Sequence, residues 1–400
     1  MVIDACRQAC PCSHPHPNAE ELEPNQQRNS RAPQAAPNPA QQPPSGCTTH
    51  ADSARSAARK GSAKSTGPRP AVSILLPVRD AADTLAICLR SIERQELTDF
   101  ECVIVDDGSR DPSREIATTF ARRDTRFRLV TGPRDGLVQA LKRGSAACRA
   151  PLIARMDADD VMDRRRLRCQ RDALEDRELA AVACHPRLFP RSALGPGMER
   201  YQGWLTSIDS PTRVREEAFV ECPIAHPTLM IRHEVLAAFP YRDMNWPEDY
   251  DLVLRVLAQG HRIGIVPSPL LAWRHTETRL SRRSPQYATE RFVACKAAFL
   301  AEGFLARQDT YRLWGYGGTG RAIARALRAH GKRPELIVEI HPGRIGRSIQ
   351  NAPVISYTEL GPPGGAPLLV SVAGLGPRTQ IRNELARRGY RTGADYVCVA

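Results

Sequence analysis

The fold is decided by Ala71-Val-Ser-Ile-Leu-Leu-Pro77 and by Phe100-Glu-Cys-Val-Ile-Val-Asp106. Each is a short apolar run, which is typical of a strand that is buried on both faces of a parallel sheet. A helical pattern at 82–93 separates them, and apolar and helical segments go on alternating as far as a strand expected at 151–156. This strand–helix–strand spacing predicts an α/β fold in which a doubly wound sheet carries helices on both faces.

Acidic residues follow two of these expected strands: Asp106 and Asp107 after one, and Asp157-Ala-Asp-Asp160 after the other. Ligands of α/β sheets bind beyond the carboxyl ends of the strands, so we expect both clusters to project into one crevice. Residues i and i+2 of a strand face the same side, which would aim Asp157 and Asp159 at one point. Carboxylates suit Mg²⁺ or Mn²⁺, whose ligand shell substrate phosphates often complete. A nucleoside diphosphate is therefore the expected ligand.

Two other interpretations of the second cluster are open but weaker. Asp159 or Asp160 alone would be explained as the cap of a following helix, yet four acidic or small residues in a row exceed what a cap requires. A calcium-binding loop of the EF-hand type would need a glycine and a distant glutamate, and neither follows at that spacing.

Over about 71 to 290 the sequence resembles family 2 glycosyltransferases of the GT-A fold. It departs from the family pattern at Asp80, where many members have asparagine, and at Arg164, where proline often follows the metal motif. These departures leave the choice of nucleotide open. The resemblance is carried, in chain order, by Ser73-Ile-Leu-Leu-Pro-Val-Arg-Asp80, Gln95, Glu101 with Val103-Ile-Val-Asp-Asp-Gly-Ser109, Gly136-Leu-Val-Gln-Ala-Leu141, Ala154-Arg-Met-Asp-Ala-Asp-Asp160 and Trp246-Pro-Glu-Asp-Tyr-Asp251.

The resemblance implies a donor site for a nucleotide-diphosphate sugar. It assigns Pro77, Asp80 and Asp106 to the pocket for the base and ribose, with Asp107 beside them. Asp157 and Asp159 would form the motif that binds the metal and the diphosphate.

In that motif Asp159 would be the direct ligand of Mn²⁺ or Mg²⁺. His275 could add a further metal ligand, with a surface histidine as the alternative. Arg274, with Arg282 and Arg283, could clamp the diphosphate, with solvated charge as the alternative.

The resemblance also implies that Asp249 is the general base, with Glu248 beside it. Asp249 would take the proton of an acceptor hydroxyl as that hydroxyl attacks the anomeric carbon, so a single displacement would invert the sugar. Both residues can instead stabilise the dipole of a helix that begins here. His226 is interpreted as a packed or acceptor-side residue.

A second α/β unit of roughly ninety residues begins near Tyr311. Gly315-Tyr-Gly-Gly-Thr-Gly320 matches a glycine-rich dinucleotide pattern, with Gly317 as its second glycine and Glu339 nineteen residues after its last. Such a turn brings backbone close to a pyrophosphate, while the acidic residue accepts from ribose. The unit resembles a Rossmann domain, and also the nucleotide-binding-like domain of some sugar O-acyltransferases. The glycine pattern predicts a nucleotide or NAD ligand. The alternative is that the glycines serve only to form the turn.

The predicted organisation is therefore a disordered tail at 1–70, a GT-A domain at 71–304 and a Rossmann-like domain at 305–400. The tail holds eleven of the 33 prolines and almost no aliphatic residues after Ile3, so it cannot bury a core. We assign no structure to 179–224, where the pattern is irregular.

Composition narrows the setting of the protein. The net charge of +13 favours anionic partners, but Arg164-Arg-Arg166 lacks flanking aromatics and predicts no nucleic-acid site. Twelve cysteines without regular spacing fit a reducing compartment. No apolar run reaches the length of a membrane span, and the N-terminus lacks the apolar core of a secretory signal. We therefore expect a cytoplasmic protein, with peripheral contact with the inner face of the membrane left open.

Two rival functions remain. A nucleotidyltransferase would need a glycine-rich phosphate loop after the first strand, and Pro77-Val-Arg-Asp-Ala-Ala-Asp83 has no glycine. A non-catalytic nucleotide- or NAD-sensing protein would not need Asp157, Asp159 and Asp249. The acceptor, whether a glycan, a lipid-linked sugar or a protein, cannot be read from the sequence.

Overall fold

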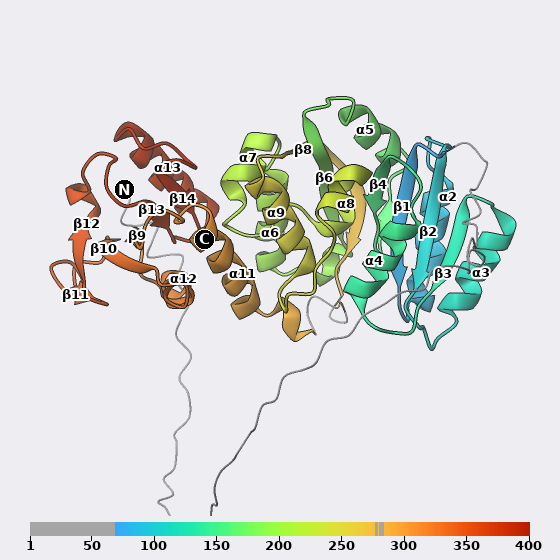
Figure 1. The fold of residues 1–400 in the computed structure, drawn as a ribbon, viewed down its shortest axis with the longest axis horizontal. Helices are drawn as coiled ribbons and strands as arrows, with labels where there is room; N and C mark the ends of the chain where they lie inside the picture. The colour runs from blue at the N-terminus through green and yellow to red at the C-terminus, as the bar shows by residue number, and fades with distance from the viewer. Residues whose placement is uncertain (1–68, 277–278, 280–283) are drawn as a thin grey trace, which may run out of the picture. The chain divides into compact units, whose positions relative to one another are not determined.

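The computed structural model describes residues 69–276, 279 and 284–400 (Figure 1). Arg69–Ala400 fall within one compact unit. The tail predicted for 1–70 lies outside the described residues, apart from its last two positions. In the described ranges, an eight-stranded and a six-stranded sheet carry helices, which confirms the predicted α/β class with two sheets.

The first sheet is mixed. Its strand order is β3-β2-β1-β4-β7-β6-β8-β5. β1 pairs in parallel with β2 and β4, and β2 with β3, whereas β7 is antiparallel to both of its neighbours. The strands are β1 (Val72–Val78), β2 (Phe100–Asp106), β3 (Phe127–Thr131), β4 (Leu152–Arg155), β5 (Val161–Met162), β6 (Leu179–Phe189), β7 (Met230–Arg232) and β8 (Arg262–Arg274).

Every residue of β1, β2 and β4 is buried, as the apolar runs predict. The register pairs Val78 with Asp106, so the loops that leave β1 and β2 start side by side. The amide of Asp107 continues this pairing by donating to the carbonyl of Val78 at 2.8 Å. Helices α2 (Ala82–Glu93), α3 (Ser113–Arg123) and α4 (Leu137–Ala147) alternate with these strands. The parallel register thus delivers both acidic clusters to one edge of the sheet.

The segment without predicted structure holds a central strand. β6 pairs in parallel with β8 from Leu179 to Phe189, and this long pairing extends as far as Arg274 of β8. β6 is buried over its first eight residues, and its pairing with β7 and β8 is entirely long-range. Between β4 and the second sheet, the described part of the chain forms the helices α5 (Arg166–Ala173), α6 (Pro196–Thr206), α7 (Pro211–Glu217), α8 (His233–Ala238), α9 (Glu248–Ala258) and α11 (Thr289–Glu302). It also forms the short 3₁₀ turns η1 (Arg191–Ala193), η2 (His226–Thr228) and η3 (Pro285–Tyr287).

The second sheet has the order β11-β12-β10-β9-β13-β14 and is parallel except for β11. This confirms the predicted smaller α/β unit. The domain boundaries at 304/305 stay a prediction, since both sheets fall within one compact unit and α11 packs on both α9 and α12. The elements of the smaller α/β unit are β9 (Thr310–Trp314), α12 (Gly318–Arg328), β10 (Arg333–Glu339), β11 (Ser348–Ile349), β12 (Ala352–Ser356), η4 (Tyr357–Glu359), β13 (Leu368–Val370), α13 (Leu375–Arg387) and β14 (Tyr396–Cys398).

A buried ion cluster joins α7 to α13. The carboxylate of Glu217 is fully buried and lies 2.7 Å from the guanidinium groups of Arg213 and Arg382 and 3.5 Å from that of Arg378. It also accepts a hydrogen bond from the indole of Trp204 at 3.0 Å. A buried carboxylate is tolerated only when such partners replace its hydration, so Glu217 holds the second sheet against α6 and α7.

We expect Glu217→Ala to lower the free energy of unfolding by about 3–5 kcal/mol, because it leaves buried guanidinium groups without their counter-charge. Chemical denaturation of the folded chain measures this. The control is Glu178→Ala, which removes an exposed partner of Arg262 and should cost less than about 1 kcal/mol. Equal losses in the two variants would contradict the role given to the cluster.

Candidate active site

A cavity of about 1650 Å³ opens at the carboxyl ends of β1 and β4. Both predicted acidic clusters reach it, which supports the expectation of one shared crevice. Asp107 represents the first cluster, whereas Asp106 is not among the described residues that line the cavity. The predicted site residues on its walls are Pro77, Asp80, Asp107, Asp157, Asp159, Glu248, Asp249, Arg274 and His275.

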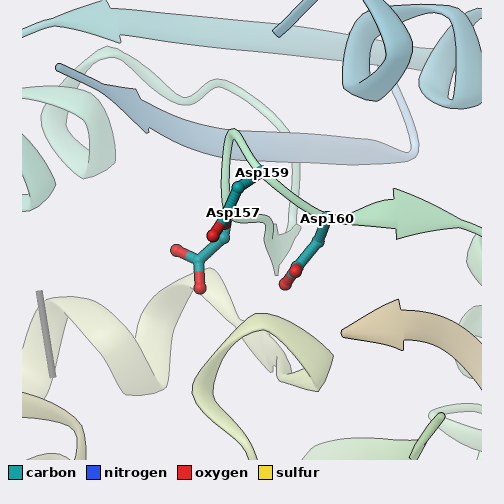
Figure 2. Close-up of side chains that lie close together, drawn as sticks. All are labelled: Asp157, Asp159 and Asp160. Atoms are coloured by element: carbon teal, nitrogen blue, oxygen red, sulfur yellow. The ribbon is translucent and has the colours of Figure 1, made fainter. Parts of the chain in front are cut away.

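Three carboxylates of the second cluster lie together (Figure 2). Ligand atoms of Asp157, Asp159 and Asp160 all lie within 4.8 Å of one another. The strand alternation expected to bring them together is not the cause, because β4 already ends at Arg155. A turn follows instead, in which the amide of Asp160 donates to the carbonyl of Asp157 at 3.3 Å. The turn gathers a third carboxylate that strand alternation would have sent to the opposite face.

The cap interpretation of this cluster is wrong. α5 begins at Arg166, and its cap position is Arg165. Asp159 and Asp160 therefore lie several residues before the helix. They are free of any capping task, and the three carboxylates face one another.

Arginines neutralise only part of this buried charge. Asp157 lies 2.7 Å from Arg155 and 3.2 Å from Arg279. Burial alone would raise the pKa of Asp157, but these two guanidinium charges lower it. In contrast, burial and the charge of Asp157 raise the pKa of Asp159 and hold the pKa of Asp160 well above its usual range. Ionisation of Asp159 and Asp160 is thus disfavoured unless a further positive charge lies beside them.

The cluster fits a hard divalent cation. One carboxylate oxygen of Asp160 accepts from the amide of Arg274 at 2.7 Å, while its other oxygen, Oδ2, is buried and has no hydrogen-bond partner among the described residues. Buried polar atoms without partners are rare and call for a ligand or ion. Oxygen donors are those preferred by Mg²⁺ and Mn²⁺. His275 is buried and lines the same cavity, but the group of ligand atoms found in the described residues does not include it.

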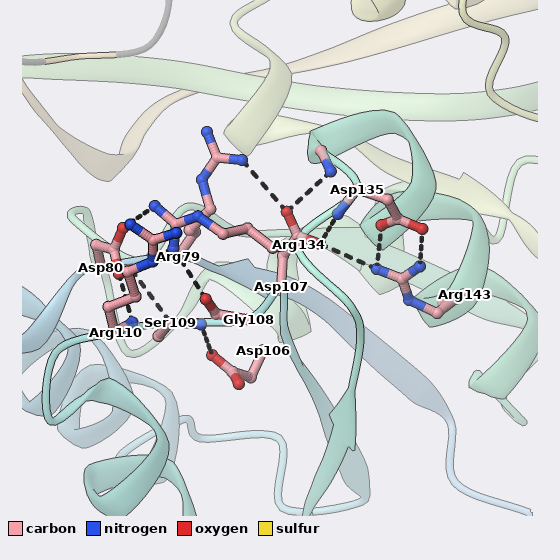
Figure 3. Close-up of polar contacts among 11 residues, drawn as sticks. Arg79, Asp80, Asp106, Asp107, Gly108, Ser109, Arg110, Arg134, Asp135 and Arg143 are labelled. Carbon is pink, nitrogen blue, oxygen red and sulfur yellow. Dashed lines mark hydrogen bonds and ion pairs between the residues drawn. The ribbon is translucent and has the colours of Figure 1, made fainter.

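Asp80 and Asp107 organise the loops beside the cavity (Figure 3). Asp80 pairs with Arg134 at 2.6 Å and accepts from the amide of Arg110, and these contacts lower its pKa to about 2. Gly108 lies between the loops at φ +66°, where a Cβ would meet that of Arg134 at 2.7 Å. The loops therefore require glycine at this position.

The two carboxylates at the end of β2 point in different directions (Figure 3). Asp107 accepts from the amides of Asp135 and Gly136 at the start of α4, at 3.1 and 3.0 Å. Asp106 is fully buried and binds Arg114 of α3 at 2.8 Å. A direct contact between Asp106 and a nucleotide stays a prediction that this geometry does not favour, because its carboxylate is already paired.

Glu248 and Asp249 open α9, as predicted from the sequence, and both face the cavity. Glu248 is buried, accepts from the hydroxyl of Tyr287 at 2.6 Å and lies 3.6 Å from His226. Burial disfavours its ionisation, but these partners lower the pKa of Glu248. For Asp249, burial and then the Glu248 charge raise the pKa to about 6. A carboxylate of this pKa accepts a proton more readily than an exposed one.

Two arginines frame the acidic turn. Arg274 donates from Nε to the carbonyl of Asp159 at 2.7 Å, so its backbone and side chain both hold the turn. Arg279 contacts Asp157 and lies over the ring of Trp273, 4.7 Å from its centroid. Arg282 and Arg283 lie outside the described residues.

Several site residues were not found from the sequence. Arg155 interrupts an apolar strand, and since buried arginine needs a partner, its position beside the acidic cluster was an available signal. The other missed residues, which long-range packing brings to the cavity, are Tyr201, Glu221, Arg279, Tyr287 and Lys296.

The glycine turn of the second sheet is built as predicted, between β9 and α12. A Cβ at Gly320 would lie 2.3 Å from the carbonyl oxygen of Gly315, so this glycine permits close packing of the helix on the strand. Gly317 has open space around it. Glu339 accepts from the amide of Tyr316 at 3.0 Å and from Arg344 at 2.8 Å. These contacts account for Glu339 without a ligand, and nucleotide or NAD binding by the turn stays a prediction.

Residues 73–238 match the family model Glycosyl transferase family 2. This match covers less than half of the chain, and over it the chain is similar to family 2 glycosyltransferases. The match includes β1, β2, β4 and the acidic turn, and ends before α9. The family 2 resemblance seen in the sequence is therefore confirmed, whereas the likeness of the second sheet to a sugar O-acyltransferase domain stays a prediction.

Relatives match parts of the chain. The Uncharacterized glycosyltransferase EpsJ of Bacillus subtilis is 34% identical over 29% of this chain and 33% of its own length. The Amylovoran biosynthesis glycosyltransferase AmsE of Erwinia amylovora is 28% identical over 53% of this chain and 78% of its own. The chain thus spans only about a third of the first of these relatives.

A solved structure of S. aureus TarS 1-349 in complex with UDP-GlcNAc is similar over 65% of this chain and 72% of that chain, with 14% identity and a TM-score of 0.49. This likeness is too weak to say anything about ligands. Among the described residues, no helix has both the length and the apolar character needed to cross a bilayer.

Proposed function

We propose that this protein is a metal-dependent, inverting glycosyltransferase that moves a sugar from a nucleotide-diphosphate donor to an acceptor hydroxyl. The observation that carries the proposal is a single cavity that holds both the acidic turn at 157–160 and the half-buried Asp249. One end offers ligands for a cation and a diphosphate. The other offers a base for a hydroxyl. The family 2 match supports this reading, because it covers the acidic turn.

The donor would lie between the loops after β1 and β2 and the acidic turn. Pro77, Asp80 and Asp107 form the wall assigned to base and ribose, and Arg274 and Arg279 lie close to where the diphosphate would be. Asp157, Asp159 and Asp160 would hold Mn²⁺ or Mg²⁺. When bound, such a cation neutralises charge that develops on a departing diphosphate, which is worth several kcal/mol.

The reacting groups then follow from the protein's own side chains. Asp249 takes the proton of the acceptor hydroxyl, and the acceptor oxygen forms a bond to the anomeric carbon. The bond from that carbon to the diphosphate oxygen breaks, and the nucleoside diphosphate leaves with the electron pair. Glu248, fixed by Tyr287 and His226, positions Asp249 and raises its basicity.

We place this activity in polysaccharide or glycoconjugate synthesis of the cell envelope, at or near the cytoplasmic face of the membrane. AmsE is named for amylovoran biosynthesis, which supports this setting. A nucleotidyltransferase or a nucleotide sensor is less well supported, because neither needs a half-buried base next to the acidic turn. The sugar is left open.

Asp159→Asn should lower the turnover of nucleotide-sugar donor by about 10²-fold or more, because a cation site worth several kcal/mol loses a ligand. Release of nucleoside diphosphate from a panel of donors, with and without Mn²⁺, measures this, and Mn²⁺ binding by electron paramagnetic resonance should weaken in parallel. The control is Asp172→Asn, a half-buried residue of α5 that pairs with Arg171. A folded Asp159→Asn variant with unchanged turnover and Mn²⁺ affinity would overturn the metal role.

The rate of transfer should fall below about pH 6, because Asp249 must be ionised to accept a proton and its pKa is raised to about 6. In Glu248→Gln the neighbouring charge is gone, so the pKa of Asp249 falls and the acid limb of the profile moves to lower pH. Profiles of kcat/KM against pH for the two proteins test this. An acid limb that stays in place in the active variant would assign it to another group.

A further inference from the structure

The cavity is larger than one small ligand requires. Pockets for a single small molecule typically measure about 300–1,000 Å³, and this cavity measures about 1650 Å³. Its walls extend well past the residues assigned to the donor. Space therefore remains for a second ligand beside a bound donor.

The second sheet supplies the far wall of this space. β9 lies between β10 and β13, so the chain leaves it on one side and returns on the other, and ligands of open α/β sheets bind where the order reverses in this way. Thr319 follows the turn after β9, while Gly374 and Leu375 follow β13. All three line the cavity, as does Arg378 one turn into α13. The carboxyl edge of the second sheet thus faces the same cavity as the acidic turn.

Asp249 lines the cavity together with residues of both ends. The imidazole of His226 lies 3.6 Å from Glu248 and lines the same cavity as Asp157. Glu248 directly precedes Asp249 in the first turn of α9. The base therefore adjoins the His226–Glu248 pair, which lines the same cavity as the cluster assigned to the donor.

Glu221 and Lys296 connect the surroundings of Asp249 with the second sheet. Glu221 lies close enough to Asp249 and to Lys296 for their charges to interact. The buried ammonium of Lys296 donates to the carbonyl of Val220 at 2.9 Å and to that of Val399, just after β14, at 2.8 Å. Lys296 thus ties the loop that carries Glu221 to the second sheet.

The side chains at this end suit a saccharide. Leu375 is 43% exposed although it is large and apolar, and the aromatic ring of Tyr201 and the exposed carboxylate of Glu221 line the same space. A saccharide combines C–H faces, which pack on apolar and aromatic groups, with hydroxyl groups that donate to carboxylates. The chemistry of this wall matches that combination.

We propose that the carboxyl edge of the second sheet is the acceptor end of the cavity, and that the acceptor is an oligosaccharide. Its terminal hydroxyl reaches Asp249, and sugars further along the chain lie against Leu375 and Glu221. This inference rests on the proposed function and adds the acceptor class to it. It also gives the second sheet a part in acceptor binding, which the glycine turn alone did not suggest.

Leu375→Arg tests the inference, with Ile87→Arg as the control, since Ile87 is 48% exposed on α2 and lies away from the cavity. The acceptors are p-nitrophenyl glycosides of one, two and three sugars, and donor hydrolysis by water is measured in parallel. For the parent, KM should fall as the acceptor lengthens. In Leu375→Arg, KM for the trisaccharide should rise about tenfold or more, because an apolar contact is lost.

The effects of Leu375→Arg on KM for the monosaccharide and on donor hydrolysis should be much smaller. The conservative variant Leu375→Met should keep the parent's KM for the trisaccharide. The Ile87→Arg variant should match the parent throughout. Equal KM values for one and three sugars in the parent, or an unchanged trisaccharide KM in folded Leu375→Arg, would overturn the acceptor site while donor hydrolysis still stands. A parent that turns over no donor would instead overturn the proposed function, and this inference with it.

Discussion

Negative charge held at the carboxyl edge of the first sheet is the constraint on which the rest of the site depends. The parallel register of β1 with β2 and β4 brings acidic loops together in a partly buried space, where unpaired carboxylates are costly. Asp106 and Asp107 are each balanced by arginines and amides, and Asp157 by Arg155 and Arg279. Asp160 is left with a buried oxygen that nothing described in the chain satisfies. This buried oxygen without a partner marks the place for a cation.

The same electrostatic rule governs the join between the two sheets. Glu217 is buried, and arginines from α7 and α13 surround it, so the second sheet is held by charge as well as by apolar packing. Lys296 adds hydrogen bonds across the same join. Because these contacts are specific in direction, they fix which edge of the second sheet faces the cavity. The positive charge of the chain therefore has local structural tasks, in addition to any general attraction of anionic ligands.

Particular residues show how far sequence reasoning reached. Both acidic clusters, Glu248 and Asp249 were expected at one site, because each follows or opens an element with a clear hydrophobic period. The residues of this set that line the cavity are Asp107, Asp157, Asp159, Glu248 and Asp249. Asp106 was assigned to the nucleotide pocket, yet it turns to Arg114, since the side of a strand end that a carboxylate faces depends on nearby loops. β6 was missed because it is defined by pairing with β8, some eighty residues later in the chain. Glu221 and Lys296 carried no local signal at all.

The sequence by itself determined the α/β class, the two sheets and the carboxylates that reach the cavity, because strand burial, helix periodicity and strand-end position are local properties. Tertiary structure alone decided how those carboxylates are used. A turn gathers Asp157, Asp159 and Asp160, burial together with Glu248 tunes Asp249, and the docked second sheet lengthens the cavity. These outcomes depend on distances between residues far apart in the chain, and such distances are set only once the whole core has packed.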